Sequence, residues 1–358
     1  MKNVLYILSL VFLSSLLLGF HTVQCAQADT RTITDMSGRE ATVPLNISRV
    51  AVLTSPCVQI MYMLGDGDRL CAITVPNKQS WLLKKLDPRI GNMPAPRRCI
   101  ADISVEELLK TRPDVCMGSF KDMAVVEKHT DIPALRVFTP RTNFEKQKKE
   151  VMFFGKVLGK NEQAAGYCAY FEETVDFLKS KTSSIPKDKR LKVFLGFGPR
   201  HLTTYGGDTY MQERIAAAGC INAAESIKTI SGKEGGLRDV SMEHLLAWDP
   251  DIIIIDYGQP EEVLGRSQWA SLSAVKHKRV YRLPYGIFMW NRPSAEAAVL
   301  FPHWLARLSY PELFGGYDIE AQIKDFYVRI FHYCLTDEDV GEMLYPKINQ
   351  YAFKGKKK

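Results

Sequence analysis

The stretch Ile103–Val115, ISVEELLKTRPDV, returns in the second half of the chain as Val240–Ile252, VSMEHLLAWDPDI, 137 positions later. In each copy a serine precedes a short segment that mixes acidic and apolar residues. This pattern predicts a helix with Ser104 or Ser241 as its N-cap. A proline then ends each helix, because the residue before proline is kept out of the α region. The chain therefore contains two halves built on one plan.

Short apolar runs alternate with helical segments through both halves. Runs of this length favour parallel strands that are buried on both faces. We expect an α/β protein with two Rossmann-like lobes and a ligand cleft between them. The predicted strands are 50–53, 70–73, 114–118 and 134–138 in the first lobe, and 191–196, 251–256 and 279–283 in the second.

A long helical region connects the two halves. Apolar residues at helical spacing predict helices over 144–158 and 162–181, with no flexible linker. One long backbone helix between the lobes implies a stiff hinge. Aromatic residues beyond Phe314 also recur at helical spacing, and we expect this tail to pack back on the second lobe. The predicted domains are 1–28 as signal peptide, 29–143 as first lobe, 144–183 as connecting helical region and 184–358 as second lobe.

The N-terminus has the features of an export signal. Lys2 precedes an apolar run over 4–20, and the A-x-A pattern at 26–28 predicts cleavage before Asp29. The alternative is a lipoprotein anchor at Cys25, but the residues before it are larger than lipidation favours. No later stretch is apolar for long enough to cross a bilayer. We expect a periplasmic protein.

Charge and cysteine content exclude several classes. The chain has 47 Lys and Arg against 40 Asp and Glu, and only 354–358 form a tight basic run, so nucleic acid is not an expected partner. Removal of Cys25 with the signal peptide leaves seven of the eight cysteines, so at least one thiol stays unpaired within the chain. Their spacing does not match zinc or iron–sulfur sites, and the apolar neighbours of most of them predict buried thiols. We expect a monomer.

Several further motifs carry a resemblance to a known class. The segments 33–39 (ITDMSGR), 48–53 (SRVAVL), 155–160 (GKVLGK) and 217–222 (AAGCIN) join the repeat in a specific order. Over roughly residues 31–333, the chain resembles the helical-backbone (class III) periplasmic substrate-binding proteins of ABC importers for iron–siderophore, haem and corrinoid complexes.

This resemblance implies a transport function. The chain is expected to bind a small metal complex and deliver it to a permease dimer with a cytoplasmic ATPase. A ferric chelate of the siderophore type is the first expected ligand, and no cofactor is implied. Molybdate or tungstate is the alternative, and a corrinoid or haem also stays open.

The resemblance also gives a role to Glu106 and Glu243, which occupy matching places in the repeat. Members of the class present one acidic residue on each lobe to arginines of the two permease subunits. A simpler explanation is that acidic residues are favoured in the first turn of a helix. Glu107 is the alternative to Glu106.

Ligands of open α/β sheets bind beyond the carboxyl ends of the strands. Aromatic and cationic residues follow the predicted strands, with few carboxylates, which suits an anionic or neutral ligand with flat apolar parts. His201 and Tyr285 are candidate metal ligands, with local packing as the alternative for both. The candidate ligand-binding residues are Cys57, Lys78, Trp81, Lys121, Arg141, Arg200, His201, Tyr205, Tyr257, Tyr285, Trp290 and Arg292.

An enzyme is the main alternative class. A chelatase would place histidines such as His201, His244 and His303 in a cleft between similar lobes. The sequence contains no H-x-x-x-H or E-x-x-H pair, no G-x-S-x-G elbow and no P-loop. A binding protein is therefore predicted rather than an enzyme.

Overall fold

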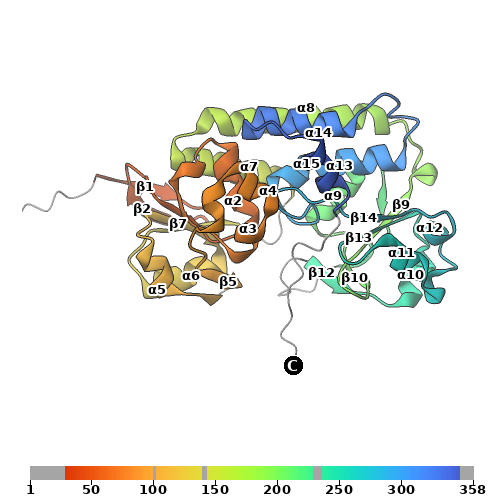
Figure 1. Cartoon of the computed structure of the whole chain (residues 1–358), viewed down its shortest axis with the longest axis horizontal. Coiled ribbons are helices and arrows are strands. Elements are labelled where there is room, and N and C mark those ends of the chain that lie inside the picture. Colours follow the sequence, from red (N-terminus) through yellow and green to blue (C-terminus); the bar gives the residue numbers. More distant parts are fainter. Residues whose placement is uncertain (1–28, 100–101, 139–142, 229–235, 347–358) are drawn as a thin grey trace, which may run out of the picture.

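The computed structural model describes residues 29–99, 102–138, 143–228 and 236–346. Two α/β lobes lie side by side beneath a layer of long helices (Figure 1). The predicted signal peptide and the candidate ligand residue Arg141 lie outside the described residues. No helix in the described ranges combines the length and the apolar character that a bilayer crossing requires.

Each lobe is built around a four-stranded parallel sheet. In the first lobe the strand order is β4-β3-β7-β8, and in the second it is β11-β9-β13-β14. The central strands are almost wholly buried, because helices cover both faces of a parallel sheet. The first sheet consists of β3 (Val50–Val52), β4 (Leu70–Ala72), β7 (Val115–Ser119) and β8 (Ala134–Phe138). The second consists of β9 (Lys192–Gly196), β11 (Ile221–Asn222), β13 (Ile252–Ile255) and β14 (Val280–Arg282).

The sequence repeat is also a structural repeat. Helices α5 (Val105–Lys110) and α10 (Met242–Trp248) begin at the predicted caps. The side chains of Ser104 and Ser241 each accept a hydrogen bond, at 3.4 Å, from the backbone N–H three residues later. The two predicted N-caps are therefore confirmed.

The repeat extends past the two helices. Arg112 and Asp249, again 137 positions apart, both have left-handed backbone conformations, with φ of 46° and 41°. The carboxylates of Asp114 and Asp251 each accept a backbone N–H at 2.8 Å, from Arg49 and from Lys192. These bonds fix the start of β7 and β13 against the preceding strand of each sheet.

A helical layer spans both lobes. The longest helix, α8 (Asn161–Thr182), runs along the edge of the molecule together with α14 (Ile319–Phe326), with α7 (Phe144–Leu158) and α13 (Ala295–Ser309) beside them (Figure 1). The connecting helical region of the prediction corresponds to α7 and α8. This helical layer covers the same side of both lobes (Figure 1).

The end of the chain differs from the prediction. Segment η6 (Tyr327–Phe331) contacts α2 (Ser55–Met63) of the first lobe. Helix α15 (Asp337–Leu344) forms an ion pair between Asp339 and Lys85, which also belongs to the first lobe. The predicted packing on the second lobe therefore omits the contacts with the first lobe, because helical spacing reveals an apolar face but not the surface that this face covers.

Short antiparallel pairs and small helices complete the lobes. The pairs are β1 (Thr30–Thr34) with β2 (Glu40–Pro44), β5 (Arg97–Cys99) with β6 (Asp102–Ile103), and β10 (Thr203–Tyr205) with β12 (Leu237–Asp239). The remaining α-helices are α3 (Val75–Gln79), α4 (Trp81–Leu86), α6 (Phe120–His129), α9 (Tyr210–Ala217), α11 (Pro260–Leu264) and α12 (Ser273–Lys276). The cysteines whose side chains are described are free thiols: Cys57, Cys71, Cys116, Cys168, Cys220 and Cys334.

Candidate ligand-binding site and docking helices

The loop over residues 283–294, between β14 and α13, brings the second lobe against the first. The Ser80 hydroxyl, which caps α4, donates to the carbonyl of Ile287 at 2.9 Å. Just after the loop, in the first turn of α13, the backbone N–H of Glu296 donates to the Gln59 side chain of α2 at 3.1 Å. This interlobe loop carries three of the predicted ligand residues, Tyr285, Trp290 and Arg292.

Arg214 of α9 holds one side of the interlobe loop. Its guanidinium is wholly buried and donates to the carbonyls of Trp290, Arg292 and Ser294 at 3.2, 2.7 and 3.0 Å. Burial lowers the pKa of Arg214 to about 10, so it remains a cation at neutral pH. One buried cation thus orders the carbonyls of three alternate residues at the end of the loop.

Glu296 holds the other side of the loop. Its carboxylate accepts hydrogen bonds from the Ile287 N–H at 3.1 Å and from the Tyr327 hydroxyl at 2.5 Å. Gly286 passes so close that a Cβ there would lie 1.6 Å from the Glu296 Oε1 atom. Glycine is therefore required at this position, and the loop, α13 and the tail form one packed unit.

Replacing Arg214 with methionine is expected to lower the free energy of unfolding by about 4 kcal/mol, because three buried carbonyls lose a charged donor. Urea unfolding of the purified chain measures the change. Lys179→Met, at an exposed position of α8, is the matched control and should change the free energy by less than about 0.5 kcal/mol. A loss below about 1 kcal/mol for Arg214→Met would show that the loop is held by other contacts.

Glu296 predicts a pH dependence of stability. Burial raises the pKa of Glu296 from 4.5 to about 7. Below pH 4.5 both the folded and the unfolded chain hold the proton, so the contribution of Glu296 to stability is fully present. As the pH rises from 4.5 to 7 the unfolded chain releases the proton first, and this contribution is lost. We expect the wild type to lose about 3 kcal/mol relative to Glu296→Gln across that window. A difference between the two proteins that does not change with pH, in unfolding curves at several pH values, would contradict this assignment.

An arginine–tyrosine cluster lies at the carboxyl edge of the second sheet. Arg292 donates to the hydroxyl of Tyr205 at 3.5 Å, and the Tyr210 hydroxyl donates to the same oxygen at 2.5 Å. Burial disfavours the charge of Arg292, yet its pKa is raised above the ordinary value, because Tyr205, Tyr210, Asp256 and Tyr285 are near enough to act on it electrostatically. We call Arg292, Tyr205, Tyr285, Asp256 and Arg282 the arginine–tyrosine cluster.

The charge of this cluster favours an anion. Burial raises the pKa of Asp256 above its ordinary value, although the Gly198 N–H donates to its carboxylate at 2.9 Å. The cluster contains two arginines, Arg282 and Arg292, against this single carboxyl group. The cations thus outnumber the carboxylate, and the phenols add neutral O–H groups.

Asn291 was not predicted from the sequence. It is wholly buried in the interlobe loop beside Arg292. Within the described residues, neither its amide nitrogen nor its amide oxygen has a hydrogen-bond partner. A buried amide without partners is costly, so Asn291 is a candidate ligand-binding residue. Arg282 was also missed, although it lies within the predicted strand 279–283 and ends β14. The sequence signal for Asn291 was its place directly before Arg292, and the signal for Arg282 was its place three residues before Tyr285.

The other candidates occupy several places. Lys78 and Trp81 are half-buried on either side of Ser80, so they flank the contact with the interlobe loop. Lys121 and Arg200 are exposed at the ends of strands β7 and β9, and Tyr257 is 39% exposed after β13. The structure therefore places Tyr205, Tyr285 and Arg292 together, whereas the wholly buried Trp290 interacts with Glu296.

Cys57 and His201 lie in the interior. Cys57 is wholly buried beside Glu150, and burial raises the pKa of the Glu150 carboxyl to about 8. His201 is wholly buried against the edge of Trp269, and burial lowers its pKa to about 4. In the described part of the chain, no three His, Cys, Asp or Glu side chains are grouped to hold a metal ion. Metal ligation by His201 and Tyr285 stays a prediction.

The other histidines of the chelatase alternative have local contacts. His244 interacts with its own helix cap, Ser241, at 3.0 Å. The His303 ring lies beside the rings of Phe177 and Tyr317 and nearly parallel to the Phe177 ring, and burial lowers the pKa of His303 to about 4. These contacts explain both histidines by packing.

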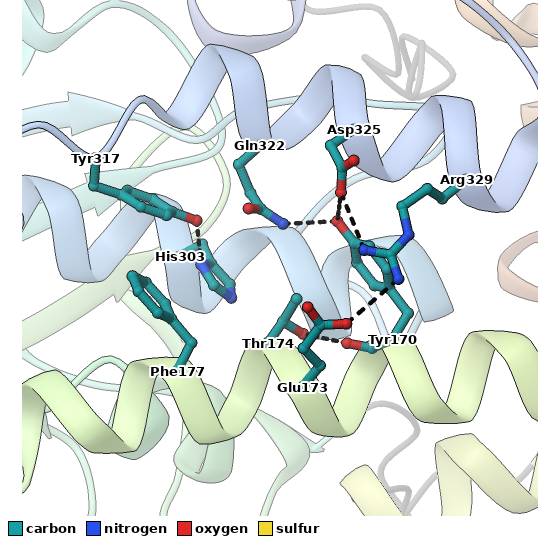
Figure 2. Close-up of a pocket in the computed structure, with 9 residues that line it drawn as sticks. All are labelled: Tyr170, Glu173, Thr174, Phe177, His303, Tyr317, Gln322, Asp325 and Arg329. Carbon is teal, nitrogen blue, oxygen red and sulfur yellow. Dashed lines mark hydrogen bonds and ion pairs between the residues drawn. The ribbon is translucent and has the colours of Figure 1, made fainter.

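A cavity of about 170 Å³ lies within the helical layer, between α8, α13 and α14 (Figure 2). Its polar groups pair with one another: Tyr170 donates to Asp325 at 3.0 Å, and Arg329 pairs with Glu173 at 3.3 Å. None of the predicted ligand residues lines it. The cavity is lined by polar side chains of packed helices and lies apart from the arginine–tyrosine cluster.

The two predicted docking carboxylates are on the surface. Glu106 is 82% exposed and pairs with Lys110 at 2.7 Å, which lowers the pKa of the Glu106 carboxyl. Glu243 is exposed, and a hydrogen bond with Ser241 lowers its pKa. Glu107 is half-buried and accepts the Ala95 N–H at 3.1 Å. Helices α5 and α10 lie at the edge of the molecule away from α8, one on each lobe (Figure 1).

The chain has two α/β lobes with parallel sheets, which a helical layer connects and the interlobe loop joins. This is the architecture of a two-lobed solute-binding protein. The chain belongs to the family described as periplasmic binding protein, whose model matches residues 50–285. This family is the predicted one.

Three known proteins illustrate the similarity. The molybdate-binding protein MolA of Haemophilus influenzae is 26% identical over 84% of this chain and 91% of its own length. The iron(3+)-hydroxamate-binding protein YxeB of Bacillus subtilis is 26% identical over 50% of this chain and 58% of its own length. The crystal structure of a periplasmic solute-binding protein from Veillonella parvula superimposes with a TM-score of 0.76 at 28% identity, over 90% of this chain and 99% of that one. The relatives of this chain are substrate-binding proteins of ABC transporters, so a permease and an ATPase are the implied partners.

Proposed function

We propose that this chain is the periplasmic solute-binding protein of an ABC importer and that its ligand is a small metal-containing anion. The observation that carries the proposal is the arginine–tyrosine cluster, where Arg292 meets Tyr205 at the carboxyl edge of the second sheet. The loop that holds Arg292 also contacts the first lobe. A ligand bound there would touch both lobes.

A tetrahedral metal oxyanion such as molybdate or tungstate is the favoured ligand. Such an anion needs several N–H and O–H donors and few carboxylates around it. Arg292, the phenols of Tyr205 and Tyr285 and the unpaired amide of Asn291 supply donors of these kinds. The similarity to MolA over most of both chains supports the same class. The oxyanion, second to the ferric chelate on sequence alone, becomes the first choice here.

A ferric chelate is the second candidate, and two exposed aromatic residues favour it. Phe120 is 36% exposed and Tyr257 is 39% exposed, and they follow the equivalent strands β7 and β13. One flat side chain on each lobe, at the carboxyl end of its sheet, would suit an organic ligand with apolar parts. The similarity to YxeB supports this candidate over half of the chain.

The ligand is best identified on the protein as the cell makes it. Native mass spectrometry with metal analysis separates the two candidates, because an oxyanion adds molybdenum or tungsten without an organic mass. Iron together with an organic mass would favour the chelate. Calorimetric titration of the emptied chain with molybdate, tungstate and a ferric hydroxamate then gives each affinity. A chain that carries no metal and binds none of the three would refute the proposed ligand class.

The remaining assignments follow from the transport role. We propose export by the signal peptide over 1–28, a monomer in the periplasm, and docking of Glu106 and Glu243 to basic residues on a permease dimer. Both carboxylates are exposed, and the repeat relates one to the other. Two equivalent acidic sites match a partner with two-fold symmetry.

A further inference from the structure

Exposed apolar side chains follow the internal repeat. Among the described residues, eight large apolar or aromatic side chains are at least 36% exposed. Leu109 and Leu246, at 48% and 44%, are 137 positions apart, and so are Phe120 and Tyr257. The other four have no exposed apolar counterpart at that spacing: Leu45, Met152, Val328 and Tyr345. Exposure at Leu109 and Leu246 is therefore a shared property of the two lobes.

The two leucines lie beside the predicted docking carboxylates. Leu109 follows Glu106 by three residues on α5, and Leu246 follows Glu243 by three residues on α10, so each pair shares one helix face. The preceding residues, Leu108 and Leu245, are wholly buried and anchor each helix to its lobe. Packing of each helix on its lobe therefore does not explain why Leu109 and Leu246 are leucines, and yet both lobes expose a leucine at this position.

We infer that Leu109 and Leu246 are two equivalent apolar contacts of the docking surface, each placed beside its carboxylate, for a permease dimer with two-fold symmetry. This inference rests on the proposed transport function and adds a partner chemistry to it. Each permease subunit is expected to present a basic side chain next to a shallow apolar depression. Both lobes carry a glutamate and a leucine at the same spacing, on helices at the same edge of the molecule. This repetition favours a partner with two-fold symmetry.

The two kinds of contact have different salt dependence. Attraction between exposed charges weakens as ionic strength rises, whereas apolar burial does not. Glu106 and Glu243 would then dominate the association rate at low salt. Leu109 and Leu246 would keep the complex together at high salt. The two contributions can therefore be measured separately.

The test uses the ligand-loaded mature chain and its permease–ATPase complex in lipid nanodiscs, with affinity measured by biolayer interferometry. We expect each of Leu109→Ser and Leu246→Ser to weaken binding about tenfold, and the double variant about 100-fold, at both low and high salt. Leu45→Ser with Val328→Ser is the control, since these side chains are equally exposed, at 47% and 46%, and lie outside the repeat. Ligand affinity and melting temperature should be unchanged in all variants.

The outcomes separate this inference from the transport proposal. A wild-type chain that does not bind the complex would overturn both. Wild-type binding that survives the double leucine change, but not charge reversal at Glu106 and Glu243, would overturn this inference alone. Equal losses in the control and in the double variant would also overturn it. So would a wild-type dimer in solution that Leu109→Ser with Leu246→Ser dissociates, because the leucines would then serve self-association.

Discussion

Arg292→Met is expected to weaken binding of the native ligand at least about 100-fold, which corresponds to loss of one charge-assisted contact to an anion. Arg292 is the cation of the interlobe loop that donates to Tyr205, and Asp256 is the carboxyl group that acts on it. Methionine keeps the length of the side chain but removes the charge and all its donors. Calorimetric titration with molybdate, or with the ferric chelate if that is what the wild type carries, measures the loss.

A matched control separates charge at the site from charge elsewhere. Arg307 is also half-buried but lies on α13 in the helical layer, so Arg307→Met should change the affinity by less than about threefold. Circular dichroism of both variants verifies the fold. If Arg292→Met binds as tightly as the wild type, the arginine–tyrosine cluster is not the ligand site.

Reversing both docking charges, with Glu106→Arg and Glu243→Arg, is expected to reduce uptake to background while ligand affinity stays unchanged. Both side chains are exposed and distant from the interlobe loop along the chain, so the ligand site is left intact. Like charges brought together across an interface oppose association, so the reversed side chains should repel basic residues of the permease. Uptake of the radioactive or isotope-enriched ligand into cells that carry each variant measures the effect.

The control for this change must also carry reversed charges at helix starts. Glu162 and Glu320 are exposed glutamates in the first turns of α8 and α14, on the helical layer. Glu162→Arg with Glu320→Arg therefore reproduces the effect on the helix dipole but not the effect on docking. Full uptake by the Glu106/Glu243 variant would refute the docking assignment. Equal losses in both double variants would show that helix destabilisation is the cause.

Much of the fold could be predicted because its main signals are local. The seven predicted strands are found within two residues of their predicted ends, since parallel strands buried on both faces appear as short apolar runs. The repeat fixed the caps of α5 and α10 for the same reason. The pairing of β10 with β12 was missed, because strands of three residues are too short to show an alternating pattern.

The site was predictable only in part. Tyr205, Tyr285 and Arg292 follow strands or lie in one loop, so a rule about strand ends was enough to select them. Arg214 could not be found in this way, since in the sequence it is one charged residue on a short amphipathic helix. Its role comes from carbonyls 76 to 80 positions later in the chain. Cys57, which the same rule selected, is wholly buried beside Glu150 at the start of α2, and its contact with a ligand stays a prediction.

The contacts between the lobes also determine when the molecule can be completed. Ser80, Gln59 and Lys85 of the first lobe contact residues 207, 237 and 254 positions later. A nascent chain has none of these partners until Ile287 has been made, and Glu296 and Asp339 follow later. Contacts between such distant residues form slowly, because long loops must close first. The first lobe therefore remains without these partners until Ile287 has been made, and the joint between the lobes assembles late in synthesis.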